Sequence, residues 1–144
     1  MQTINSLSQE IQNSITNYGE EFKDLFEAIE KVVYKSDLNL FTAIVEEITD
    51  INMQNYYGWT LLHITIRREE TAMVELLLKK GADINKTDGV GWTPLMEAIM
   101  DDKPDLVKLL VKKGADKTIV NQRGATAPML AQKFGRSSMY SYLA

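Results

Sequence analysis

One block of residues recurs in this chain at a spacing of 33 positions. The sequence Gly-Trp-Thr begins at Gly58 and again at Gly91, and a shorter form, Gly-Ala-Thr, begins at Gly124. An apolar run and the triplet Gly-Ala-Asp follow the first two blocks, with the glycines at Gly81 and Gly114. Self-similarity at a fixed period of about 20–50 residues is the signature of a stacked repeat protein. The period therefore predicts a row of similar units.

Capping residues divide each unit into two helices. A threonine at the start of the first helix can accept a hydrogen bond from a free amide in the first turn. Pro94 lies just inside such a start, where its missing N–H costs nothing. Gly81 and Gly114 follow the last turn of the second helices, where a left-handed residue ends a helix. The predicted capping threonines are Thr60, Thr93 and Thr126.

Residues 21–54 fit a divergent first unit. The tripeptide Asp-Ile-Asn at Asp50 returns one period later at Asp83. Aligning Ala28 with Thr65 predicts four extra residues between the helices of this unit, around residues 34–39. A surface turn tolerates such an insertion. The predicted repeat domain covers residues 21–144, and its units are residues 22–54, 55–86, 87–118 and 119–144.

An amphipathic helix is predicted over residues 1–20. Ser6 and Gln9 can form a capping box, and Thr3 is the alternative start. The segment either caps the apolar end of the stack, as terminal units must, or binds a partner or a membrane. It contains no Lys or Arg, which disfavours a membrane, and we favour the cap. The apolar stripe, with steps of three or four residues, consists of Ile4, Leu7, Ile11, Ile15 and Tyr18.

Composition narrows the function classes. The 144 residues are 44% hydrophobic and 25% charged, as in an average globular chain. The net charge is −4 and the pI is about 5.0, which disfavours nucleic acid and anionic membranes and suits a basic protein partner. Without cysteine there is no disulfide or thiolate metal site. We see no leader and no apolar run near ~20 residues, so a cytoplasmic protein is expected.

The repeated pattern resembles that of ankyrin repeats. Gly-Trp-Thr-Pro-Leu-x-x-Ala at Gly91, the apolar run that ends in Gly-Ala-Asp and the 33-residue period carry the resemblance. It covers residues 22–144 and is strongest over residues 55–118. The resemblance implies an all-α solenoid, in which helix–turn–helix units with β-turn fingers stack side by side behind an N-terminal capping helix.

The sequence departs from the ankyrin pattern at several positions. The family's usual histidine survives only as His63, and methionine replaces it at Met96 and Met129. The second helix of the last unit, predicted over residues 138–143, is short. These departures fit a capping unit at each end of the stack.

The resemblance also implies a function. Ankyrin-like arrays are binding scaffolds without chemistry, so we expect a monomeric, non-enzymatic protein–protein interaction module with no cofactor. A partner would bind the finger tips and the concave helix face, where side chains are not needed for the stacking of the units. A narrower alternative is an immunity-type protein that occludes a toxin or enzyme, and another is a structural or oligomeric scaffold unit. The candidate partner-binding residues are Tyr56, Tyr57, Trp59, Arg67, Arg68, Val90, Trp92, Met100, Asp101, Gln122 and Arg123.

Aromatic residues stand out among these candidates. Exposed tyrosine and tryptophan are typical interface anchors, each worth ~2 kcal/mol or more when a partner buries them. Trp59 and Trp92 are one period apart, so the stack would place them next to each other on one face. The structural alternative is that each indole packs on the neighbouring finger. For Tyr56 and Tyr57 that alternative is weaker, because two adjacent rings cannot both point inward.

His63 invites a catalytic or metal-binding interpretation, which we reject. Metal sites need three or four convergent ligands, and this single histidine has no partner of that kind in the sequence. The resemblance implies instead that its imidazole bonds backbone in the neighbouring turn. Asp101, Asp102 and Asp105 cluster at one turn, but no cleft or matched second group supports acid–base chemistry. We therefore expect no catalytic and no metal-binding residues.

Overall fold

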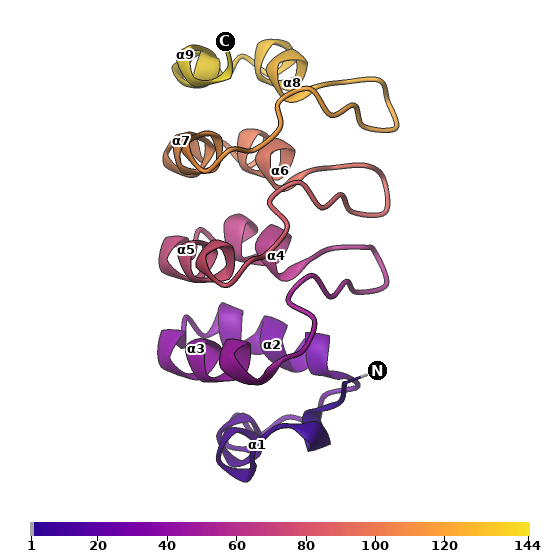
Figure 1. The fold of residues 1–144 in the computed structure, drawn as a ribbon, viewed down its shortest axis with the longest axis vertical. Coiled ribbons are helices and arrows are strands. Elements are labelled where there is room, and N and C mark those ends of the chain that lie inside the picture. Colours follow the sequence, from indigo (N-terminus) through magenta and orange to yellow (C-terminus); the bar gives the residue numbers. More distant parts are fainter. Residues whose placement is uncertain (1) are drawn as a thin grey trace.

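The structure is a computed structural model that describes residues 2–144. Antiparallel helix pairs stack into one elongated array, with long loops projecting along one side (Figure 1). The predicted all-α repeat solenoid is confirmed. No helix within these residues is long and apolar enough to cross a membrane. The helices are α1 Gln9–Thr16, α2 Leu25–Tyr34, α3 Leu38–Glu47, α4 Leu61–Arg67, α5 Thr71–Lys79, α6 Pro94–Met100, α7 Pro104–Lys112, α8 Ala127–Lys133 and α9 Tyr140–Leu143.

The first helices of units two, three and four start as predicted. Thr60 Oγ1 accepts the backbone N–H of His63 at 3.2 Å, and Thr93 and Thr126 cap α6 and α8 in the same way. Residues 61–66 of α4 and residues 94–99 of α6 are buried throughout. These helices therefore form the middle layer of the array. Only their C-terminal ends, at Arg67 and Met100, are partly open to solvent.

The N-terminal segment is a cap, as predicted, but its helix is shorter than predicted. Leu7, Ile11 and Ile15 are buried, and α1 packs against α3. Residues 4–6 form a separate 3-10 turn, and α1 begins only at Gln9. The predicted Ser6–Gln9 capping box is wrong, because Ser8 precedes α1 without a side-chain cap. The Ser8 amide donates instead to Glu47 Oε1 of α3 at 2.7 Å, which ties the cap to the first unit.

The predicted insertion in the first unit is also wrong. Ser36, Glu69 and Asp102 have φ values of 54°, 54° and 55° and occupy the same place in three successive inter-helix turns. They are spaced by the period, so the turn after α2 contains no extra residue. Instead, α2 starts one turn early, with Asp24 Oδ1 accepting the Glu27 amide at 2.8 Å. The alignment of Ala28 with Thr65 was misplaced by that additional turn, and no finger precedes α2.

Three fingers precede the later units, and we name them finger 2 (residues 54–60), finger 3 (residues 87–93) and finger 4 (residues 120–126) (Figure 1). Each is closed by the side-chain oxygen of one residue, which accepts two backbone amides; in finger 2, Asn55 Oδ1 accepts those of Tyr57 and Trp59, both at 3.0 Å. Asp88 and Asn121 do the same in fingers 3 and 4.

Backbone hydrogen bonds join successive fingers. The Gly89 amide donates to the Tyr57 carbonyl at 3.0 Å, and the Gln122 amide donates to the Val90 carbonyl at 3.3 Å. Gly58 has a φ of 79°, and a Cβ built there would lie 2.4 Å from the Gly89 nitrogen. Glycine is required at this position by both the positive φ and the close approach of the next finger.

Candidate functional site

A continuous row of aromatic and arginine side chains crosses finger 2 and the end of α4. The Tyr56 and Tyr57 rings meet edge to face at 5.5 Å, and the Tyr57 and Trp59 rings lie 4.9 Å apart. The Arg67 guanidinium lies 4.0 Å from the centre of the Trp59 ring. Tyr56 is 96% exposed and Tyr57 is 61% exposed, so both tyrosines point outward, in agreement with the expectation that two adjacent rings do not both point inward.

A separate contact of the same kind, next to this row, involves a residue of the first unit that sequence reasoning missed. The Arg68 guanidinium lies 4.7 Å from the centre of the Tyr34 ring, and Tyr34 Oη donates to Glu30 at 3.1 Å. Burial, together with the Glu30 carboxylate, raises the pKa of Tyr34. Tyr34 lies one period before Arg67, so a correct alignment of the first unit would have identified it. We name as the aromatic strip the residues Tyr34, Tyr56, Tyr57, Trp59, Arg67 and Arg68.

An ion pair links the aromatic strip to the third unit. Arg67 Nη2 donates to Glu97 Oε1 at 2.6 Å, and Glu97 is almost fully buried. Asp101 lies one turn later, half-buried at the end of α6, and its Oδ2 has no hydrogen-bond partner in residues 2–144. Burial, and next the Glu97 carboxylate, raise the pKa of Asp101 to about 7. Sequence reasoning missed Glu97 because the equivalent residues of the second and fourth units, Ile64 and Leu130, are apolar. The signal that could have identified Glu97 was its charge at a position that is otherwise apolar.

The candidates on the third unit lie outside the aromatic strip. Trp92 is half-buried, and no ring contact joins it to Trp59 within the described chain. The proximity predicted for the two indoles therefore does not amount to a stacked pair. Val90 is 51% exposed in finger 3, and Met100 is half-buried at the end of α6.

The candidates of finger 4 have unequal surroundings. Gln122 Nε2 donates to the Gly89 carbonyl at 3.2 Å, so this side chain fastens finger 4 to finger 3. Arg123 is exposed, and its backbone amide donates to Asn121 Oδ1 at 2.9 Å. The guanidinium of Arg123 makes no ion pair with the described residues. Of these two, Arg123 is the freer to meet a partner.

His63 is a structural residue, as predicted. Its Nδ1 accepts the Thr60 amide at 3.2 Å, and its Nε2 lies 2.9 Å from the Trp92 carbonyl of finger 3. Nε2 therefore carries the proton, and both ring nitrogens are occupied. Burial lowers the pKa of His63, which keeps the imidazole neutral. In the part of the chain that the structure describes, no group of three metal-binding side chains gathers around it or elsewhere.

Comparisons with known proteins agree with this architecture. A family model described as ankyrin repeats, in three copies, matches residues 25–121. The 60 kDa lysophospholipase of Mus musculus is 40% identical over 48 residues, which are 33% of this chain and 8% of that protein. The chain thus spans a small part of the length of this curated relative. Ankyrin repeats are generally protein–protein interaction modules and typically non-enzymatic. By the period, the capped helix pairs, the stacked fingers and this match, the chain belongs to the ankyrin-repeat family.

Proposed function

We propose that this protein is a non-enzymatic module that binds a partner protein through the aromatic strip, with the finger tips and the concave helix face at its periphery. The observation that carries the proposal is the series of ring and guanidinium contacts from Tyr56 to Arg67, together with the contact of the next residue, Arg68, with Tyr34. Tyrosine, tryptophan and arginine are the residue types enriched at the energetic centres of protein interfaces.

Order within the aromatic strip supports the proposal. Binding must offset the entropy lost by each side chain that becomes fixed, about 0.5–1.5 kcal/mol for a flexible one. Arg67 is already held between the Trp59 ring and the Glu97 carboxylate. Arg68 and Tyr34 hold each other across two units. A partner would therefore meet a surface whose arginines are largely ordered, and it would retain more of the contact energy.

The experiment compares two exposed pairs of residues. Purified wild-type protein and a Tyr57→Ala/Arg68→Ala variant are used to capture binding proteins from the native host. Binding of the main partner is then measured by calorimetry. Loss of one interface anchor typically costs ~2 kcal/mol, so we expect affinity to fall at least tenfold.

The matched control is Tyr140→Ala/Lys113→Ala, which removes an exposed tyrosine and an exposed cation far from the aromatic strip. We expect the control to bind like the wild type. Undiminished binding by Tyr57→Ala/Arg68→Ala, with an unchanged circular dichroism spectrum, would show that the aromatic strip is not the binding site.

A further inference from the structure

The row of fingers has an open end beside the first unit. Fingers 3 and 4 are each joined to the preceding finger by the amide of Gly89 or Gln122. The equivalent amide in finger 2, one period earlier, belongs to Tyr56, and it donates to no acceptor in residues 2–144. The carbonyl expected opposite it is that of Asp24, which instead accepts the Ala28 amide at 3.2 Å inside α2. Because α2 starts early, no finger of the first unit packs against finger 2.

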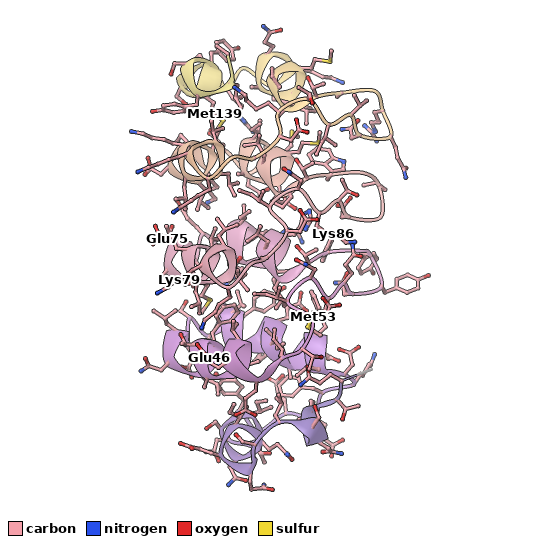
Figure 2. The ribbon with its side chains drawn as sticks, viewed as in Figure 1. Glu46, Met53, Glu75, Lys79, Lys86 and Met139 are labelled. Atoms are coloured by element: carbon pink, nitrogen blue, oxygen red, sulfur yellow. The ribbon has the colours of Figure 1, made fainter. Side chains whose placement is uncertain are left out.

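A pocket of about 420 Å³ lies at this open end. Its volume is in the range of about 300–1,000 Å³ found for ligand pockets. Leu25, Phe26 and Met53 are its apolar residues, and Met53 lies near the base of finger 2 on the side of α2 (Figure 2). We name this the N-terminal pocket, and it is lined by Gln2, Asp24, Leu25, Phe26, Thr49, Asp50, Met53, Gln54, Asn55 and Tyr56.

The charge of the N-terminal pocket is negative. Asp24 and Asp50 each use one carboxylate oxygen to accept a nearby backbone amide, at 2.8 and 2.9 Å. Neither carboxylate pairs with a cation among the described residues. Residues 1–72 contain twelve acidic and five basic side chains, whereas residues 73–144 contain eight and eleven. The field at this end of the array therefore attracts a cation.

We infer that the N-terminal pocket receives an extended segment of a basic partner protein. A carbonyl of the segment accepts the Tyr56 amide in place of the missing finger, as in other strand-addition interfaces. A Lys or Arg side chain enters the pocket, with its aliphatic stem over Leu25 and Phe26 and its cation between Asp24 and Asp50. Long cationic side chains suit such a site because the stem is apolar and only the end is charged. This inference rests on the proposed function, since it identifies part of the partner's chemistry.

Peptide selection tests the inference. A random heptapeptide library displayed on phage is selected on the immobilised wild-type protein, and a fluorescein-labelled consensus peptide is titrated by anisotropy. We expect Lys or Arg at a fixed position of the selected peptides. The peptide should bind an Asp24→Asn/Asp50→Asn variant at least tenfold more weakly. Asparagine keeps the helix cap and the turn, so this variant should fold.

The matched control is Asp83→Asn, which changes the equivalent of Asp50 one period later. Asp83 Oδ1 accepts the Asn85 amide at 2.9 Å in the same kind of turn, but Asp83 is not part of the pocket. We expect this variant to bind the peptide like the wild type. Hydrogen exchange supplies a second readout: the Tyr56 amide should exchange rapidly in the free protein and become protected by the peptide, whereas the Gly89 amide should be protected in both states.

Three results obtained without the natural partner would overturn the inference. They are selection of peptides without a fixed basic residue, equal affinity for the wild type and Asp24→Asn/Asp50→Asn, and a self-association in sedimentation that the same variant abolishes. The last result would indicate that a second copy of the chain occupies the pocket. Tyr57 and Arg68 do not line the pocket, so the two proposals fail separately. If the natural partner depends on the Tyr57/Arg68 pair but not on Asp24 and Asp50, only the pocket inference falls.

Discussion

Two neighbouring interfaces of this array share a framework but differ in chemistry. Units two and three are joined by the His63 bond to the Trp92 carbonyl, by the Arg67–Glu97 ion pair and by the exposed Lys103–Glu69 ion pair at 3.0 Å. Units three and four have Met96 where His63 stands and Met100 where Arg67 stands. The second interface therefore lacks the first two of these polar links, although its helices and fingers repeat the same geometry. The third link recurs, because Arg136 and Asp102, one period after Lys103 and Glu69, form an ion pair at 3.9 Å.

Arg136, the equivalent of Lys103, supplies further polar contacts in the second interface. Arg136 Nε donates to the Ile99 carbonyl at 3.0 Å, and its Nη2 donates to the Met100 carbonyl at 2.9 Å. These carbonyls lie in the last turn of α6, where intrahelical donors run out. The comparison teaches that finger stacking and the ion pair between successive inter-helix turns are common to both interfaces, whereas the polar contacts at the His63 and Arg67 positions are not repeated.

The largest effect is expected where the first finger contact is closest. A Cβ at Gly58 would lie 2.4 Å from the Gly89 nitrogen, whereas one at Gly91 would lie 3.1 Å from the Gln122 nitrogen. Strain at positive φ and overpacking add, so Gly58→Ala should cost about 3 kcal/mol or more and Gly91→Ala about 2 kcal/mol. Urea denaturation measures both.

Gly124→Ala is the control for strain alone, because Gly124 has a φ of 77° and a Cβ added there would meet no atom within 4 Å. It should cost about 1 kcal/mol. Equal losses in Gly58→Ala and Gly124→Ala would show that the fingers do not approach as closely as described.

A smaller effect is expected from exchanging the interface chemistry at His63. His63→Met introduces into the second unit the methionine that the third unit has at the equivalent position, Met96. The Trp92 carbonyl then loses its hydrogen-bond donor. The cost should be about 1–2 kcal/mol, the penalty of a buried polar group left unpaired. Thermal unfolding of both proteins near pH 7.5 gives the difference, and a cost near zero would show that the His63 bond to the Trp92 carbonyl does not stabilise this interface.

The same variant should change the pH dependence. Burial lowers the pKa of His63 below its ordinary 6.5, so the unfolded state binds the proton better. The stability that the neutral imidazole contributes is present above pH 6.5 and is lost as pH falls from 6.5 toward the folded-state pKa. His63→Met should lack this loss, and an identical pH slope in both proteins would argue against a buried neutral imidazole.

The smallest effect is expected at Asp101, whose equivalent in the second unit is Arg68. Its pKa is raised from 3.8 to about 7, so the folded state binds the proton better than the unfolded state. The corresponding stability is present below pH 3.8 and is lost as pH rises through 7. Asp101→Asn should therefore be more stable than the wild type above pH 7, by less than about 1 kcal/mol because the side chain is partly exposed. Urea midpoints at pH 5 and pH 8 test this.

The framework was accessible from sequence because each framework residue acts locally. Thr60 caps the helix that it precedes. Gly58 has a positive φ because of the conformation of finger 2, to which it belongs. The period then placed these residues in successive units. His63 could be assigned because the ankyrin resemblance implied that its ring bonds backbone in the neighbouring turn, and the ring does bond the Thr60 amide and the Trp92 carbonyl of the next finger.

The candidate site was less accessible. Tyr56 and Tyr57 were placed outward correctly, and their role in binding stays a prediction. Tyr34 was missed because the first unit was aligned as if it contained an insertion, when it contains an early helix start. Glu97 was missed because its value lies in a contact with Arg67, 30 residues away on another helix.

The sequence by itself determined the repeat family and the capping threonines of the later units, because both follow from local spacing and from the period. Only the tertiary structure decided which free positions meet. Stacking brought Arg68 onto Tyr34 and Arg67 between Trp59 and Glu97, and the early start of α2 left Tyr56 beside an open pocket. Those contacts join residues of different units, and they depend on how closely the units pack.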